Sequence, residues 1–159
     1  MYAVISKILS KFFKPSTIFK YGFNISPMYR RSTGKIIEVS DDLLKASVKI
    51  PISYKNKNYV GSIFGGSLFS ATDPVFMIQL MNILGSDYVV WDKSAEIKFK
   101  RPAKENSYVD FIFAKEEIVK IKERVLEEKE IDLIKEIKIT NKDASTVYAE
   151  VSKIIYIAD

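Results

Sequence analysis

Asp73 is the only charged residue between Leu68 and Leu84, in the most apolar segment of the sequence. An ionised carboxylate is costly in apolar surroundings unless it is paired or takes part in a reaction. Ser67, Ser70 and Asp73 are spaced three residues apart, so a helix would present all three side chains along one face. The pattern predicts either a structural acid, hydrogen-bonded to a serine or to the backbone, or a catalytic acid or base in a pocket.

Three glycines, Gly61, Gly65 and Gly66, precede this segment. Glycine permits tight turns that other residues resist, which is the simpler interpretation of the cluster. Alternatively, the missing side chains let a ligand approach the backbone at the start of a helix, where free N–H groups favour an oxyanion. Gly85 stands where a glycine commonly ends a helix. We therefore expect one buried helix over residues 66–84, entered through a glycine-lined turn.

The sequence contains no cysteine and no histidine. Disulfides, thiolate metal sites and cysteine nucleophiles are excluded, and so are Ser-His-Asp triads, imidazole metal ligands and a histidine base. Any reaction must use carboxylate, hydroxyl, amide, lysine or backbone groups, and we expect no metal. With 159 residues, 47% of them hydrophobic, the chain is predicted to form a single globular domain over residues 1–159.

The formal net charge is +5 and the isoelectric point is about 9.2, which permits anionic partners. Lysine and arginine are spread along the chain without a dense run, and the aromatic motif of RNA-binding domains is missing from the sequence. We therefore expect no nucleic-acid partner.

The first 20 residues carry an apolar stripe at helical spacing, with lysines beside it and a break at Pro15. One interpretation is a basic amphipathic helix on a membrane surface. The interpretation that we favour is a helix that covers the core or a dimer edge. The segment lacks the features of a signal peptide and no window is a convincing membrane span, so a cytoplasmic location is expected. The stripe consists of Ile5, Ile8, Leu9, Phe12 and Phe13, beside Lys7, Lys11 and Lys14.

Alternating apolar and polar residues predict six strands, and a second, charged helix is expected over residues 116–129. The helix at 66–84 is too apolar to lie on a surface. We therefore expect an α+β fold in which an antiparallel sheet curls around this buried helix. The open edges of such a sheet favour a homodimer or a dimer of dimers. The expected strands span residues 35–39, 44–50, 95–99, 109–113, 133–139 and 147–157.

Two blocks of the sequence carry a family resemblance: NKNYVGSIFGGSLFSATDP at residues 56–74 and LGSDYVVWDKSAEIKFKRP at residues 84–102. The glycine pattern followed by Asp73 resembles the signature of hot-dog thioesterases of the phenylacetyl-CoA type. The two blocks together are more similar to the hot-dog family catalogued as domain of unknown function 4442. The chain departs from the thioesterase signature because Phe64 replaces a histidine. In addition Pro74, which has no N–H and kinks helices, follows the acid directly.

The resemblance implies the hydrolysis of an acyl thioester such as acyl-CoA. Asp73 would act as the general base on water, or would attack directly and form an anhydride. The backbone N–H groups of Gly65 and Gly66 would bind the developing oxyanion, and Asn58 would orient the water or the acyl carbonyl. Hot-dog enzymes usually build this site across a dimer interface, so Asp73 of one copy would face the glycine turn of the other. No cofactor is expected except CoA as part of the substrate.

The same resemblance suggests which residues contact the substrate. Basic residues at the end of the expected strand 95–99 are candidates for contacts with the CoA phosphates, although a solvated strand face explains them equally well. Asp92 and Lys93 would form a structural ion pair or, alternatively, Asp92 would be a second polar element of the pocket. The expected substrate contacts are Gly61, Phe64, Ser67, Ser70, Lys98, Lys100 and Arg101.

A non-catalytic module that binds acyl-CoA or lipid is the alternative function, with a membrane contact through residues 1–14 as a less favoured extension. Phe64 in place of histidine favours the module, whereas Asp73 on its polar stripe favours an enzyme. The hot-dog dehydratases are excluded, because by resemblance they need an active-site histidine and the sequence contains none.

Overall fold

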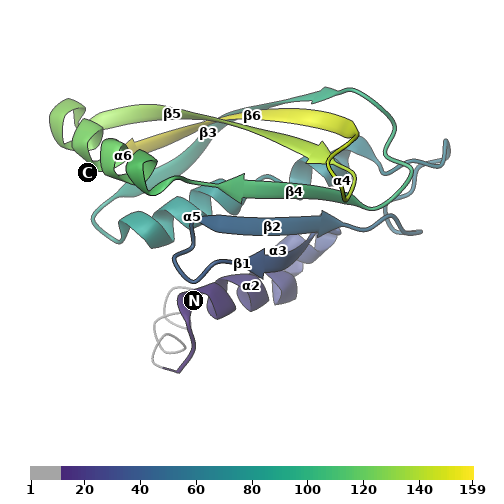
Figure 1. Cartoon of the computed structure of the whole chain (residues 1–159), viewed down its shortest axis with the longest axis horizontal. Helices are drawn as coiled ribbons and strands as arrows, with labels where there is room; N and C mark the ends of the chain where they lie inside the picture. Colours follow the sequence, from purple (N-terminus) through teal and green to yellow (C-terminus); the bar gives the residue numbers. More distant parts are fainter. Residues whose placement is uncertain (1–11) are drawn as a thin grey trace.

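The computed structural model describes residues 12–159, which form one six-stranded antiparallel sheet with the strand order β1-β2-β4-β5-β6-β3 (Figure 1). The alternation expected from the sequence is visible in β6, where every second residue from Ala149 to Ile157 is buried. The strands are β1 (Lys35–Val39), β2 (Lys45–Ile50), β3 (Val89–Phe99), β4 (Ser107–Ile112), β5 (Glu130–Thr140) and β6 (Val147–Ala158).

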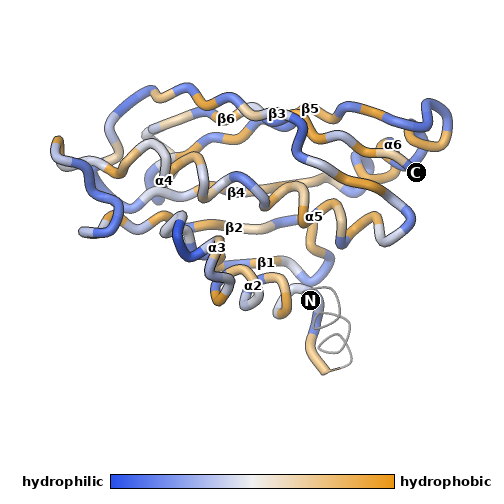
Figure 2. Tube along the Cα trace, turned by 180° about the vertical axis from the view of Figure 1, so that it is seen from behind, coloured by the Kyte–Doolittle hydropathy of each residue, from blue (hydrophilic) through white to orange (hydrophobic). Residues whose placement is uncertain are grey.

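Two helices, α4 (Gly65–Ser70) and α5 (Val75–Leu84), lie within the curl of this sheet (Figure 1). The path of α5 is largely hydrophobic (Figure 2), as a buried helix requires. The α+β class and the hot-dog arrangement predicted from the sequence are confirmed. The single helix expected over residues 66–84 needs a correction, because the turn at residues 71–74 divides it. Pro74 has no N–H to continue α4, and it stands at the N-cap of α5.

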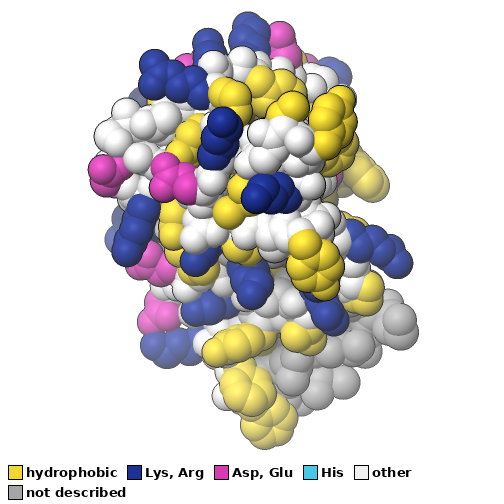
Figure 3. Space-filling view, turned by 90° about the vertical axis from the view of Figure 1, so that its right-hand side faces the viewer, with side chains coloured by type: hydrophobic (Ala, Val, Ile, Leu, Met, Phe, Trp, Pro, Cys, Tyr) yellow, Lys and Arg dark blue, Asp and Glu magenta, His cyan; other side chains and the backbone are white. Residues whose placement is uncertain are grey.

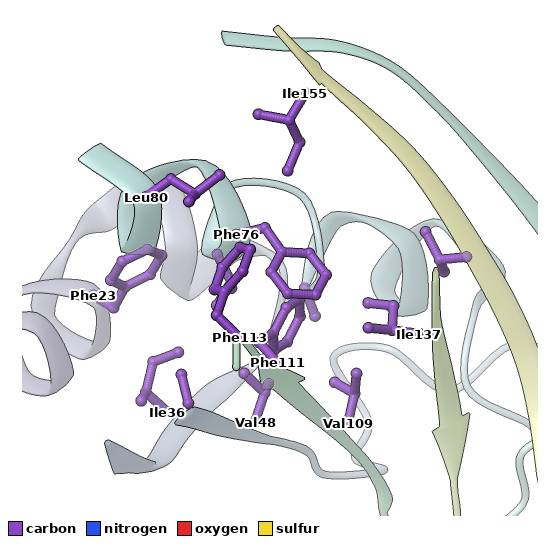
Figure 4. Close-up of a cluster of buried hydrophobic side chains, with 14 of the residues drawn as sticks. Phe23, Ile36, Val48, Phe76, Leu80, Val109, Phe111, Phe113, Ile137 and Ile155 are labelled. Atoms are coloured by element: carbon purple, nitrogen blue, oxygen red, sulfur yellow. The ribbon is translucent and has the colours of Figure 1, made fainter. Parts of the chain in front are cut away.

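The core forms where α5 packs on the inner face of the sheet (Figure 4). The buried ring of Phe76 makes edge-to-face contacts with Phe111 and Phe113, at centroid distances of 4.9 and 5.2 Å. Such pairs contribute about 0.5–1.5 kcal/mol beyond their buried area. These contacts fix the start of α5 against the end of β4, and they thereby fix the turn that carries Asp73.

β3 is longer than expected, since it includes residues 89–94 as well as the predicted strand at 95–99. It pairs with β6 along its whole length, with an irregularity between Asp92 and Ser94 that changes the local direction of the side chains. The charged helix expected at 116–129 is α6 (Lys115–Glu128), which buries Ile118, Ile121 and Val125.

The N-terminal part of the described chain forms α2 (Pro15–Ile25) and α3 (Pro27–Arg31). Residues 1–11 of the amphipathic helix expected over 1–20 lie outside the described residues. Pro15 begins α2 and does not end a helix, which suits a residue without an N–H at the first helical position. Because α2 buries Phe19 and Phe23, the core-covering interpretation holds for it. Within residues 12–159, none of the helices is both long and apolar enough to span a membrane.

The two edges of the sheet differ in how they are covered. Along β1, the side chain of Asn24 donates to the carbonyl of Ile36 at 2.8 Å and accepts from its N–H at 2.9 Å. Lys20 of α2 donates to the carbonyl of Ile37 at 2.7 Å. Along β3, by contrast, β6 is the only strand of the described chain that pairs with it. An uncovered edge of this length is a template for another strand.

Candidate functional site

Asp73 lies in the turn between α4 and α5, not on the face of a continuous helix. Its side chain is 60% exposed, whereas the neighbouring Thr72 and Pro74 are buried. The expectation of a carboxylate enclosed by apolar side chains is therefore wrong for the single chain. The exposed carboxylate is accessible to water and to a substrate, as a base or a nucleophile requires.

A buried ammonium group holds this acid. Lys153, on the inner face of β6, has no exposed side-chain surface, and its Nζ lies 3.5 Å from Oδ1 of Asp73. The same Nζ donates a hydrogen bond to the backbone carbonyl of Asp73. A buried charge is tolerated only when it is paired and hydrogen-bonded. These contacts therefore attach the turn to β6.

Asp92, on β3, is the second acidic residue that pairs with Lys153, and its Oδ2 lies 2.6 Å from Nζ of the lysine. Burial raises the pKa of Asp92 above its ordinary value; the hydrogen bond and charge of Lys153 oppose this shift, and the charge of Asp73 adds to it. Oδ1 of Asp92 is buried without a hydrogen-bond partner among the described residues. Nowhere in the described part of the chain do three or more acidic side chains gather as potential metal ligands.

The expected ion pair between Asp92 and Lys93 is not formed. Lys93 instead contacts Asp132 of β5 at 2.7 Å, on the exposed side of the sheet, while Asp92 turns towards Lys153. The physical reason is that consecutive residues of a strand point to opposite faces. The geometry therefore favours the alternative, in which Asp92 belongs to the polar cluster around Asp73.

The glycine turn packs against two phenylalanine rings. A Cβ atom on Gly65 would lie 2.7 Å from Cζ of Phe99, at the end of β3, and a Cβ atom on Gly66 would collide with the ring of Phe64. The backbone N–H groups of Gly65 and Gly66 have no acceptor within the described residues. The turn thus combines unpaired donors with backbone that lacks side chains, the combination that an oxyanion site needs.

Asn58 shapes the loop that leads into this turn. Its Oδ1 accepts hydrogen bonds from the N–H groups of Val60 and Ser62, both at 3.1 Å, and its Nδ2 donates to the hydroxyl of Ser62 at 3.0 Å. Gly61, in the same loop, has a φ of +80°, which glycine adopts without strain. The geometry gives Asn58 and Gly61 structural roles, and within one chain it does not bring Asn58 to Asp73.

The remaining apolar and hydroxyl residues expected at the site lie on and before α4. Phe64, at the N-cap of α4, is exposed, as is Ser70, while Ser67 is half-buried. They form an accessible surface between the glycine turn and Asp73.

The basic residues at the end of β3 differ in their partners. Nζ of Lys98 lies 3.7 Å from a carboxylate oxygen of Glu96, and Nζ of Lys100 lies 2.9 Å from one of Glu150. Arg101 is exposed and forms no ion pair with the residues that the structure describes. Phe99, whose ring touches the glycine turn, lies between these two lysines in the sequence. The candidate phosphate contacts therefore lie beside the candidate oxyanion site.

Asp73 and the glycine turn lie at opposite ends of α4. Gly65 is the first residue of α4, and Asp73 lies in the turn that follows its last residue, Ser70. α4 itself spans about 8 Å at a helical rise of 1.5 Å per residue. A base must lie within about 3 Å of the proton it takes, and an oxyanion donor within about 3 Å of the reacting oxygen.

A separate cleft of about 880 Å³ lies between β4 and β5. These strands are joined by a single residue pair, Tyr108 with Thr140, and Phe76 and Val109 are among the residues that line the opening. Its volume is within the range of ligand pockets. Of the expected substrate contacts it includes Lys98 alone, and it contains neither the acid nor the glycine turn.

The family model described as domain of unknown function DUF4442 matches residues 16–157. The chain belongs to this family. The match includes both sequence blocks that carry the resemblance, so the predicted family is confirmed. No protein of curated function matches the sequence.

Solved structures of low sequence identity share the fold of this DUF4442 protein. A protein of unknown function from Pseudomonas aeruginosa, described as a probable thioesterase, matches with a TM-score of 0.78 at 18% identity, over 89% of this chain and 94% of that one. A protein of unknown function from Chlorobaculum tepidum matches at 0.71 and 15% identity, over 90% and 93%. A thioesterase from Haemophilus influenzae matches at 0.55 and 9% identity, over 100% and 91%. These likenesses establish the fold.

Lys153 is the site residue of the DUF4442 chain that sequence analysis missed. A signal for it exists, because Val151, Lys153, Ile155 and Ile157 alternate along β6 and so share the buried face. A lysine in register with buried apolar residues needs a buried acceptor. What the sequence does not reveal is that the acceptors come from residues 73 and 92.

Proposed function

We propose that this DUF4442 protein hydrolyses acyl thioesters such as acyl-CoA. The observation that carries the proposal is the carboxylate of Asp73, which is open to solvent while the buried Lys153 holds its turn in place. The thioesterases among proteins of the same fold are consistent with this class of reaction.

In the proposed reaction, the thioester carbonyl oxygen accepts hydrogen bonds from the N–H groups of Gly65 and Gly66 of one copy. Asp73 of the other copy takes a proton from water and the water oxygen attacks the carbonyl carbon. The C–S bond then breaks, and the departing thiolate takes the proton from Asp73 and leaves as the thiol. Direct attack by the Asp73 carboxylate, followed by hydrolysis of the anhydride, leads to the same products. Loss of one oxyanion donor typically costs about 3–4 kcal/mol of transition-state stabilisation.

A homodimer is part of this proposal, because the acid and the glycine turn of one chain lie at opposite ends of α4, which is about 8 Å long by helical rise. The uncovered edge of β3 is the surface that we assign to the contact. Phe99, at the end of that edge, already touches Gly65. In the proposed dimer, the β3 strands of two copies pair and extend the sheet, with the glycine turn of one copy facing Asp73 of the other. A cytoplasmic location is proposed with it.

The test is the release of thiol from a panel of acyl-CoAs of different chain lengths. It compares the wild type with Asp73→Asn and with Asp132→Asn, a control that removes another partly exposed acid paired with a lysine. We expect turnover of at least one substrate, a fall of roughly 10²–10⁴-fold in Asp73→Asn, and little change in the control. Hydrolysis by folded Asp73→Asn within a few-fold of wild type would rule out the proposed role of the acid.

A non-catalytic acyl-CoA-binding module is the second candidate. Phe64 favours it, because an aromatic ring without a hydrogen-bond donor lies against Gly66. Calorimetric titration with the same acyl-CoA panel separates the two candidates. Binding without thiol release from any member would select the module.

A further inference from the structure

The positive charge of the protein is concentrated at one end of the sequence. The first 37 residues contain seven lysines and arginines and no aspartate or glutamate, whereas the whole chain contains 25 basic and 20 acidic residues. The rest of the chain therefore carries more acidic than basic side chains. The described part of this segment forms α2, α3 and the start of β1, along one edge of the sheet (Figure 1).

Three cations of this region are available to an anionic partner. Arg30, Arg31 and Lys35 are exposed and form no ion pair within residues 12–159. Lys14, by contrast, contacts Asp41 at 2.6 Å, and Lys20 donates to a backbone carbonyl of β1.

Large apolar side chains are exposed on the same elements. The inner face of α2 buries Phe19 and Phe23, while Ile18, Tyr21 and Ile25 follow one another at helical spacing on the opposite face. Ile25 is 70% exposed. Large hydrophobic side chains are visible at the lower end of the molecule in Figure 3, the end at which α2 lies in Figure 1. The exposed apolar residues of this region are Phe12, Phe13, Tyr21, Ile25 and Met28.

We propose that this basic, apolar surface, formed by residues 12–35, docks on a membrane that contains anionic lipid. Lys and Arg side chains contact the lipid phosphates, while the exposed apolar side chains enter the boundary between headgroups and acyl chains. A second copy does not fit here, because it brings the same positive charge to the contact. Nucleic acid neutralises the cations but leaves Ile25 and Met28 in water.

This surface lies along β1, and the proposed dimer contact lies along β3, at the opposite end of the strand order. Docking at residues 12–35 therefore leaves the β3 edge uncovered. The proposal does not depend on thioester hydrolysis, since it is tested in the absence of any thioester.

The experiment is co-sedimentation of the full chain with vesicles of phosphatidylcholine alone or with 30% phosphatidylglycerol. We expect binding to the anionic vesicles that weakens as salt is raised from about 50 to 500 mM, because salt screens the attraction. Arg30→Ala with Arg31→Ala should weaken partitioning roughly 30-fold, since each basic side chain near an anionic surface contributes about fivefold. Ile25→Ser with Met28→Ser should weaken it on both kinds of vesicle.

The matched controls make equivalent pairs of changes on α6, another surface helix with exposed apolar and basic residues: Val119→Ser with Leu126→Ser, and Lys120→Ala with Lys122→Ala. Unchanged binding of these controls supports the assignment of the surface. Three results would overturn it: equal binding of wild type to neutral and anionic vesicles, an equal loss in the α6 controls, or dissociation of the dimer by Ile25→Ser with Met28→Ser while vesicle binding persists.

Discussion

Nζ of Lys153 lies 2.6 Å from Oδ2 of Asp92 and 3.5 Å from Oδ1 of Asp73. One buried ammonium group thus joins an acid on β3 to the turn that precedes α5. The candidate catalytic carboxylate of Asp73 is consequently positioned by a residue 80 positions away in the sequence. The geometry of the site therefore depends on the correct insertion of β6 into the sheet.

The substitution Lys153→Met keeps the length and the apolar stem of the side chain but removes the cation. We expect the free energy of unfolding to fall by about 3–5 kcal/mol, because the carboxylate of Asp92 is left largely buried and unpaired. Thioester hydrolysis per folded molecule should fall as well, since the Asp73 turn loses its anchor. Urea unfolding and thiol release measure the two effects. Adding Asp92→Asn should restore part of the stability but not the activity.

Lys135→Met is the control for this prediction. Lys135 is also poorly exposed and contacts an acid, Glu117, at 2.8 Å, so its loss should lower stability. Because its ammonium group pairs with neither Asp73 nor Asp92, activity per folded molecule should fall less than in Lys153→Met. Equal losses of activity in the Lys135 and Lys153 variants would show that Lys153 acts only through stability.

The raised pKa of Asp92 predicts a pH dependence of stability with a definite sign. In the pH range between the unfolded and folded pKa values, the folded state binds more protons than the unfolded state at this group. The stabilisation from Asp92 is therefore complete below its ordinary pKa, near 4, and is lost as pH rises through the raised value. The stability of wild type minus that of Asp92→Asn should decline over this window in urea titrations. A difference that grows with pH would mean that the attraction of Lys153, which lowers the pKa of Asp92, outweighs the burial that raises it.

Alanine at Gly65 or Gly66 should lower hydrolysis by roughly 10–10³-fold, because the added Cβ keeps the substrate carbonyl away from the backbone N–H donors. The effect on stability should be smaller. The rings that a new Cβ would meet belong to Phe99 and Phe64, which are both more than half exposed. Gly22→Ala is the matched control, since nothing lies near its Cβ position in α2, and it should be stabilising by about 0.5–1 kcal/mol.

A second variant distinguishes obstruction of the Gly65 backbone from displacement of the Phe99 ring. If Gly65→Ala acts by displacing Phe99, then adding Phe99→Ala should restore hydrolysis. If the loss persists in the folded double variant, close approach to the backbone is the cause, as the proposed site requires.

Assembly through β3 should be sensitive to charge at Trp91. Trp91→Glu is expected to yield monomers at micromolar concentration in light scattering, together with a loss of hydrolysis, because an edge charge opposes strand pairing. Ile134→Glu is the control: the two residues are almost equally exposed, at 63% and 64%, but Ile134 lies on β5, an interior strand of the sheet, and not on the β3 edge. A wild-type monomer under these conditions would contradict the shared site.

Complementation tests the shared site directly. Asp73→Asn and Gly65→Ala should each be inactive alone. After exchange of subunits in an equal mixture, about a quarter of wild-type activity should return, because half of the dimers then contain one intact site of two. Failure to recover activity although mixed dimers form would place both halves in one chain.

Arg101→Ala tests the contact with the nucleotide. Since Arg101 forms no ion pair in the described chain while Lys98 and Lys100 face acids, its removal should raise KM for acyl-CoA several-fold. KM for an acyl thioester of N-acetylcysteamine, which has no phosphate, should be unchanged. Equal effects on both substrates would show that Arg101 supports the structure of the site and does not contact the CoA phosphates.

Much of the sheet was predictable because segments such as residues 44–50 and 95–99 alternate apolar and polar residues. The amphipathic pattern of α6 was equally local. The exposure of Asp73 was not predictable, since the apolar composition of residues 68–84 indicates burial but not where a helix breaks. Pro74 was the available signal for that break. The cluster around Lys153 combines residues from three distant segments, and a single sequence does not state which strands become neighbours.

The position of β6 between β5 and β3 has a consequence for synthesis. β3 pairs only with β6 in the described chain, so from the moment it leaves the ribosome until some 50 residues later it has no strand partner. Throughout that interval Asp92 and the apolar side chains of β3 are without the lysine and the strand that later cover them. Any ribosomal pause before residue 147 prolongs the exposure of two free strand edges, the circumstance in which nascent chains bind chaperones or one another.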